Sequence, residues 1–157
     1  MKRRLILMNW YIHFSRLLFL MTFALVRDGS AVEAAKMYWT DARGIHRAEL
    51  DGRSVETLLP VTLSDPRAIA VDSVRGKVYW TDFRTHKIQR SNPDGTNVED
   101  IVSTGVWYPW GIAVDAIHGK VYWTSLDHQP YPYQSSKIQR ANLDGTDVED
   151  FIKFQGF

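Results

Sequence analysis

Residues 76–82 read Gly-Lys-Val-Tyr-Trp-Thr-Asp, and this stretch occurs three times in the chain with small changes. It returns at residues 119–125 as Gly-Lys-Val-Tyr-Trp-Thr-Ser, and in shortened form at residues 36–41 as Lys-Met-Tyr-Trp-Thr-Asp. The three tyrosines are 41 and 43 residues apart. A repeat of this length, with short apolar runs separated by turn residues, is typical of a β-propeller blade or a related array.

The middle repeat predicts four antiparallel strands in a meander, which is the usual blade of a propeller. Its apolar and aromatic runs are rich in β-forming residues, and Gly76 suits the turn between the first two. The Asp-Gly pair at residues 94–95 predicts the last hairpin turn. The strands are expected at residues 66–72, 77–82, 87–91 and 98–102.

The third repeat has the same order, whereas the first repeat supplies only three strands. Its inner strand is expected to be missing, because a segment typical of a signal peptide stands in that place. We therefore predict an all-β fold: a partial propeller of about three four-stranded blades within residues 36–157. The blades are expected at about residues 36–60, 66–103 and 109–154.

Residues 1–31 resemble a secretory signal peptide, which we expect as a short helix. Three basic residues lie among the first four, a mostly apolar run spans residues 17–26, and Gly29 and Ala31 are small residues suited to a cleavage site. The run is too short to cross a bilayer of ~30 Å by itself. A cleaved signal, an uncleaved anchor and a misassigned start codon remain alternatives. The first two place the chain outside the cytoplasm: secreted, periplasmic or at the cell surface.

Composition excludes several function classes. The net charge is +1 without a basic stripe, which argues against nucleic-acid binding. The chain has no cysteine, so packing and hydrogen bonds alone must hold the fold. Hydrolase, zinc-protease and phosphate-loop motifs do not occur, and the five histidines lack ligand spacing. No catalytic, cofactor-binding or metal-binding residue is predicted.

Three motifs together resemble the class B (YWTD) repeats of the low-density lipoprotein receptor family. They are the Tyr-Trp-Thr-Asp tetrad, the Ile-Gln-Arg and Asp-Gly-Thr runs at residues 88–90 and 94–96, and Pro-Trp-Gly-Ile-Ala-Val-Asp at residues 109–115. The resemblance covers residues 36–154. It implies a β-propeller, usually six-bladed, that acts as an extracellular binding or receptor-gating module and not as an enzyme. The chain departs from the family in having about three blades and no flanking cysteine-rich module.

The repeated residues are expected to be structural. Along a strand, Trp80 points to one side and Tyr79 and Thr81 to the other, so both sides can pack against neighbouring blades; a sugar- or base-stacking platform is the alternative. Asp41 and Asp82 end their strands, where a carboxylate accepts backbone N–H groups, with metal binding as the alternative. The recurring arginines are expected to pair with carboxylates. The predicted structural residues are Tyr38, Trp39, Thr40, Asp41, Tyr79, Trp80, Thr81, Asp82, Tyr122, Trp123, Thr124, Arg47, Arg90 and Arg140.

One loop breaks the repeat. The tetrad tyrosine and the third-strand isoleucine are 9 residues apart in the middle repeat but 16 apart in the third. The extra residues, within 126–134, include two prolines and two tyrosines, which suit recognition, although loops also tolerate insertions at small cost. The preceding connection is aromatic and belongs to the same face. The candidate partner-binding residues are Trp107, Tyr108, Trp110, His128, Tyr131 and Tyr133.

We predict a non-catalytic, receptor-type module that binds a protein or peptide and uses no cofactor. Three blades do not close a ring, so the chain is expected to be part of a longer gene or a half-propeller that dimerises. The alternatives are a six-bladed lactonase- or hydrolase-like calcium enzyme and a purely structural surface repeat.

Overall fold

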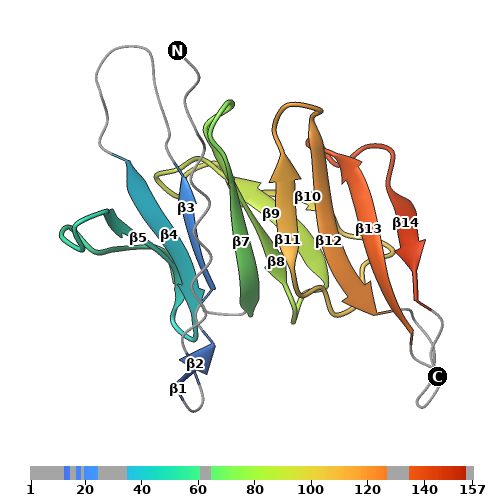
Figure 1. Ribbon diagram of the computed structural model, residues 1–157, viewed down its shortest axis with the longest axis horizontal. Helices are drawn as coiled ribbons and strands as arrows, with labels where there is room; N and C mark the ends of the chain where they lie inside the picture. Colours follow the sequence, from blue (N-terminus) through green and yellow to red (C-terminus); the bar gives the residue numbers. More distant parts are fainter. Residues whose placement is uncertain are drawn as a thin grey trace.

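Three four-stranded antiparallel sheets stand side by side in the computed structural model, which describes residues 13–14, 17–18, 20–24, 35–60, 65–126 and 135–154 (Figure 1). Blade 1 holds β3 (Leu20–Ala24), β4 (Lys36–Asp41), β5 (Gly44–Glu49) and β6 (Glu56–Pro60). Blade 2 holds β7 (Pro66–Asp72), β8 (Lys77–Asp82), β9 (Lys87–Ser91) and β10 (Glu99–Val102). Blade 3 holds β11 (Ile112–Asp115), β12 (Lys120–Leu126), β13 (Ser136–Asn142) and β14 (Glu149–Lys153). Two short strands, β1 (His13–Phe14) and β2 (Leu17–Leu18), form a separate pair.

The predicted all-β propeller is confirmed. Within each blade, strands that follow one another in sequence pair in order, as in a meander. Each outer strand pairs through one register shift, for example between Asp100 and Val102 of β10, which bends the edge of the blade.

The inner strand of blade 1 corrects the sequence prediction, which left that position empty. Most of the segment expected as a helix, residues 1–31, lies outside the described residues. β3 pairs with β4 from Leu20 opposite Thr40 to Ala24 opposite Lys36. The described residues before β4 form strands and no helix. A short apolar run suits a buried strand as well as a signal sequence, and periodicity does not separate them. The free edge of β4 favours the strand, because the backbone N–H and carbonyl groups along that edge need hydrogen-bond partners.

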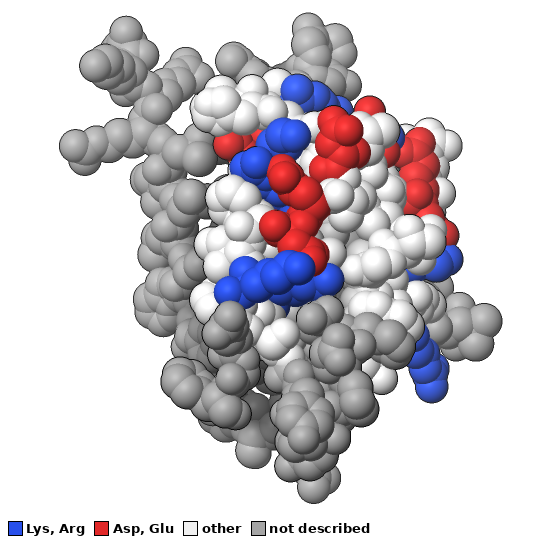
Figure 2. All heavy atoms as spheres, turned by 90° about the vertical axis from the view of Figure 1, so that its right-hand side faces the viewer, with Lys and Arg blue, Asp and Glu red and all other residues white. Residues whose placement is uncertain are grey.

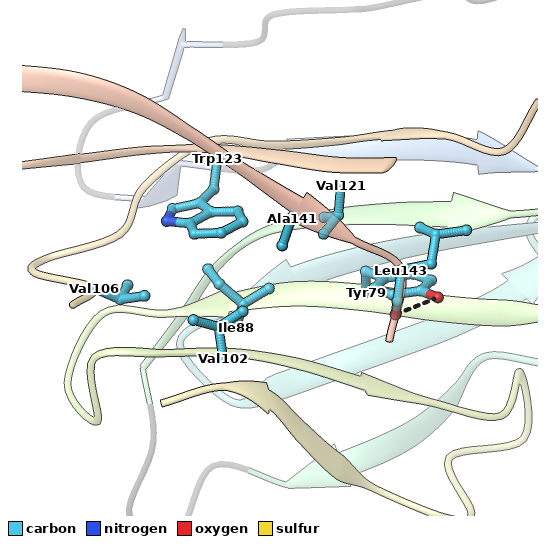
Figure 3. Close-up of a cluster of buried hydrophobic side chains, with 8 residues drawn as sticks. All are labelled: Tyr79, Ile88, Val102, Val106, Val121, Trp123, Ala141 and Leu143. Carbon is cyan, nitrogen blue, oxygen red and sulfur yellow. Dashed lines mark hydrogen bonds between the residues drawn. The ribbon is translucent and has the colours of Figure 1, made fainter. Parts of the chain in front are cut away.

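The core lies between the blades. On the blade 2 side of one cluster are Tyr79, Ile88, Val102 and Val106, and on the blade 3 side Val121, Trp123, Ala141 and Leu143 (Figure 3). A second cluster packs Tyr38 and Ile45 of blade 1 against Ile69, Val78 and Trp80 of blade 2. The tetrad tyrosine thus faces the following blade and the tetrad tryptophan the preceding one, because successive side chains of a strand alternate. Each blade buries both of its sides only when it has two neighbours.

Candidate functional site

One face of the three-blade array gathers five aromatic side chains and one arginine from three segments that are separate in sequence. β7 contributes one residue, the turn between β8 and β9 two, and the connection from β10 to β11 three. We call this group the aromatic face: Arg67, Phe83, His86, Trp107, Tyr108 and Trp110.

The rings of the aromatic face touch one another. Phe83 lies 5.2 Å from Tyr108 and 5.8 Å from Trp110 between ring centroids, the latter edge to face at 89°. His86 lies 4.6 Å from Tyr108 and 5.2 Å from Trp107. These distances fall in the favourable range for aromatic pairs, so the cluster is pre-formed.

Arg67 places a positive charge inside this cluster. Its guanidinium carbon lies 4.8 Å from the centre of the Phe83 ring and 5.0 Å from that of Trp110, which are cation–π distances. Its Nη2 lies 2.6 Å from the Asp65 carboxylate. Its buried Nε has no hydrogen-bond partner among the described residues. The arginine therefore contacts the face through two rings and one carboxylate.

Backbone hydrogen bonds hold the segments of the face together. The buried Asp82 carboxylate accepts the backbone N–H groups of Asp65, Arg84 and Thr85. Phe83 N–H donates to the Asp65 carbonyl at 2.9 Å. The strand end therefore fixes both the entry to blade 2 and the turn that carries Phe83 and His86.

The connection that carries the tryptophans is anchored in the core and strained at one residue. Val106 and Pro109 are buried, and Trp110 N–H donates to the Thr124 carbonyl at 2.9 Å. Tyr108, between these anchors, has a φ of +45°, and His86 beneath its ring has +59°. Such values cost a non-glycine residue about 1–3 kcal/mol and persist only where the surroundings enforce them. The buried anchors on either side of Tyr108 enforce this backbone, and Tyr108 and Trp110 are 40% and 47% exposed.

The structure brings Trp107, Tyr108 and Trp110 together, as candidates chosen from sequence, and adds three residues that the sequence did not single out. Sequence patterns do not point to Arg67, Phe83 and His86, because the first lies in a strand and the others in an ordinary turn. What could have indicated them is their position at the end of the blade where the connections between blades run. His128, Tyr131 and Tyr133 lie outside the described residues. Leu126, where that loop begins, donates its N–H to the Trp107 carbonyl at 2.9 Å.

The recurring arginines each bridge an outer strand, and two of them also reach the next blade. They pair with Glu56, Glu99 and Glu149 across the sheet. Arg47 Nη1 donates to the Pro93 carbonyl at 2.9 Å and Arg90 Nη1 to the Leu143 carbonyl at 2.8 Å. The tetrad tyrosines lie opposite these arginines on the neighbouring strand: Tyr38, Tyr79 and Tyr122.

The strand-end carboxylates bind backbone groups nearby. Burial by itself raises the pKa of Asp41, but the Arg43 N–H and the His46 ring, 2.7 and 2.8 Å away, lower it below its usual range. Asp72 accepts the N–H groups of Val74 and Arg75. These acids stabilise turns within their own blades.

The described residues contain no cluster of three or more His, Cys, Asp or Glu side chains suited to a metal ion. Within the same residues no helix is long and apolar enough to cross a membrane.

The family model of the low-density lipoprotein receptor repeat class B matches residues 35–73 and 76–116. The chain belongs to this class B repeat family. Mouse low-density lipoprotein receptor-related protein 5 is 43% identical over 60 residues, which are 36% of this chain and 4% of that protein. Mouse nidogen-2 is 41% identical over 56 residues, 34% of this chain and 4% of that protein. The class B repeats of this chain thus span a small part of these relatives.

Among solved structures, the nidogen/laminin complex contains a chain with a TM-score of 0.67 and 31% identity, over 75% of this chain and 44% of that one. Oligogalacturonate lyase in complex with manganese matches at a TM-score of 0.59 and 8% identity, over 91% and 50%. At that identity the likeness shows the fold alone. The β-propeller of class B repeats is thereby established for this chain.

Proposed function

We propose that this class B repeat chain is a non-catalytic module, secreted or at the cell surface, that binds a protein or peptide through its aromatic face. The observation that carries the proposal is Tyr108: a strained backbone between two buried anchors holds its ring, beside Trp110, toward solvent. Rigid aromatic side chains supply large contact area at low entropy cost, and tyrosine and tryptophan are enriched among residues that dominate binding energy.

The relatives support a protein partner. A nidogen chain of the same fold was solved in a complex with laminin. The similar mouse protein is named low-density lipoprotein receptor-related protein 5, which links it to a receptor. The inner-strand carboxylates of blades 2 and 3 favour a non-catalytic role, because Asp72 and Asp115 each accept two backbone N–H groups of their own turns. A calcium enzyme needs such groups turned toward a shared ion.

For the N-terminal segment we propose an export signal that is not cleaved and that stays with the folded chain through β3. Its residues 20–24 supply β3, so cleavage near Ala31 would remove the inner strand of blade 1. For the arc as a whole we propose completion to a closed ring, by further blades or by association.

A selection against the full chain tests the binding face. Random linear peptides displayed on phage are selected on the chain, and the affinity of the recovered peptides is measured for Tyr108→Ala and Trp110→Ala. We expect each variant to weaken binding at least about tenfold, since the loss of such aromatic anchors costs ~2 kcal/mol or more.

Ile117→Ala is the matched control, because Ile117 is 87% exposed in a turn at the opposite end of the blade. Its peptide affinity is expected to equal that of the unaltered chain. Equal losses in all three variants, or none in the two face variants, would overturn the proposal.

A further inference from the structure

We propose that the two end surfaces of the arc are complementary to each other and bind a second copy of this chain head to tail, blade 3 of one copy against blade 1 of the other. This inference deepens the ring-completion part of the proposed function by naming the partner and its contacts. It does not depend on what the aromatic face binds.

The argument begins with a junction that the chain makes twice. Where one blade meets the next, an arginine of the third strand donates to the carbonyl just before the next Asp-Gly turn: Arg47 to Pro93 and Arg90 to Leu143. In the second junction the Tyr79 hydroxyl, 3.4 Å away, shares the Leu143 carbonyl. A repeated junction of this kind has a donor side and an acceptor side.

The glycine of each Asp-Gly turn completes the acceptor side. A Cβ at Gly145 would lie 1.8 Å from the Ile101 carbonyl oxygen, and one at Gly95 would lie 3.0 Å from that of Leu58. Both carbonyls belong to the outer strand of the preceding blade. The turn therefore approaches that strand closely, at Gly145 too closely for any side chain, and both glycines have a positive φ that glycine tolerates.

Blade 3 carries an unoccupied donor side. Arg140 lies opposite Tyr122 and pairs with Glu149 at 2.6 Å, as in the other blades. The described residues hold no blade beyond it. Its guanidinium lies 4.4 Å from the centre of the Phe151 ring, and Phe151 is 47% exposed.

Exposure along this side confirms that it lacks a neighbour among the described residues. Tyr122 is half-buried, whereas Tyr38 and Tyr79 are 1% and 0% exposed. Thr124 is exposed, whereas Thr40 and Thr81 are buried. Figure 2 views the arc from this end and shows a stripe of acidic and basic side chains beside a broad uncharged area. The surface is that of an inter-blade contact left open.

Blade 1 carries an acceptor side that no other described residue occupies. Leu50 precedes the Asp51-Gly52 turn, the position that Pro93 and Leu143 hold in their blades. Leu50 is 52% exposed, whereas Leu143 is 6% exposed. Gly52 has a φ of +81°, close to those of Gly95 and Gly145, yet no atom of the described residues lies within 4 Å of a Cβ built there. An open hollow borders the turn, lined by Ala35, Glu49, Leu50, Asp51, Arg53 and Ser54.

The two sides fit each other by register. Phe151 occupies in β14 the position that Leu58 and Ile101 hold in their outer strands, so the Gly52 turn of a second copy has the Phe151 carbonyl to approach. Arg140 and Tyr122 then reach the Leu50 carbonyl. A head-to-tail contact uses two different surfaces, and two copies that each use both surfaces close a ring of six blades. A second copy is the favoured partner because the chain carries both a donor side, on blade 3, and an acceptor side, on blade 1. These are the two sides of the junction that it already makes between blades 1 and 2 and between blades 2 and 3.

The test measures the mass of the full chain in solution by size exclusion with light scattering. We expect twice the 18.1 kDa of one chain. Leu50→Lys places a cation next to Arg140 of the second copy, and Arg140→Glu removes the hydrogen-bond donor. Each variant alone is therefore expected to be a monomer of 18.1 kDa. Truncating a buried charged hydrogen-bond partner weakens an interface by roughly 30-fold or more.

Mixing the two variants gives the sharpest result. A mixed pair keeps one unaltered junction and gains, at the other, an ion pair between the two substituted side chains, so equal amounts of both are expected to restore the double mass. Arg84→Ala, which removes an exposed arginine from the turn between β8 and β9, is the control and keeps the dimer. Unchanged circular dichroism shows that each variant is folded, and Arg140→Ala is the milder substitute if Arg140→Glu is not.

A folded, unaltered chain that stays at 18.1 kDa at every concentration would overturn the proposal and favour further blades from a longer chain. A dimer that persists in both variants, or a mixture that stays monomeric, would also overturn it. None of these outcomes alters peptide binding by Tyr108 and Trp110, so the two proposals fail separately.

Discussion

Thr81 of blade 2 donates its hydroxyl to the Trp110 carbonyl of the segment that leads into blade 3, at 2.8 Å. The same oxygen accepts the Ala68 N–H at 3.1 Å. One buried hydroxyl therefore links the inner strand of its own blade to the entry of the next, and Thr40 makes the corresponding bond to the Arg67 carbonyl at 3.2 Å. The tetrad threonine is a joint between blades.

We expect Thr81→Val to destabilise the chain by about 2–3 kcal/mol, because it leaves a buried N–H and a carbonyl without their partner at nearly constant volume. Urea unfolding followed by tryptophan fluorescence measures the change. Thr104→Val is the control at an exposed position outside the blade junctions and should cost less than about 1 kcal/mol. Equal losses of unfolding free energy in the two variants would show that the Thr81 hydroxyl does not link the blades.

Gly145→Ala should destabilise more than Gly105→Ala. Both glycines have a positive φ, +87° and +71°, so both substitutions carry the backbone strain of alanine, about 1–2 kcal/mol. Only at position 145 does the added Cβ meet a carbonyl of the preceding blade, which adds roughly 1–3 kcal/mol of overpacking. Thermal unfolding of the two variants side by side measures the difference; the same midpoint in both would contradict the close approach.

Asp41 predicts an acid-sensitive contribution to stability. Its pKa in the folded chain lies below the ordinary 3.8, so the stabilisation is present above pH 3.8 and is lost as the pH falls through the lower folded pKa. Stability should therefore fall with acidification in that range, and Asp41→Asn should flatten the fall. Chemical unfolding from pH 7 down to the acid limb measures it, with the exposed Asp147→Asn as control. The assignment to Asp41 would be contradicted if the fall in stability with acidification were unchanged in Asp41→Asn but smaller in Asp147→Asn.

Backbone strain at Tyr108 can be separated from the loss of its ring. Tyr108→Ala and Tyr108→Gly both remove the ring, but only glycine accepts a φ of +45° without cost. We expect the glycine variant to be the more stable by about 1 kcal/mol. Calorimetric unfolding compares the two. Should the alanine variant prove equal or more stable, the native backbone at this position would not be strained.

Most of the blade could be predicted from sequence, since the signals that define it are local. The alternation around Tyr79 and Trp80, and the Asp94-Gly95 turn, specify strands and hairpins within a few residues. The inner strand of blade 1 was predicted wrongly. Its apolar residues fit two structures, and what selects one is the unpaired edge of β4, twelve residues or more further along the chain.

The candidate site was predicted only in part. Trp107, Tyr108 and Trp110 stand close together in sequence and could be found as an aromatic cluster. Arg67, Phe83 and His86 could not, because each looks ordinary in its own strand or turn and gains its place only when β7, β8 and the following connection meet.

The sequence by itself determined the family, the repeat, the strand order and the side of each strand that carries tyrosine or tryptophan, because alternation and turn chemistry act over neighbouring residues. Only the tertiary structure decided which carbonyl each arginine reaches, which glycines approach a neighbouring strand, and which end surfaces stay open. Those features depend on groups brought together from different blades, and a linear pattern does not record which blades are neighbours or which lack one.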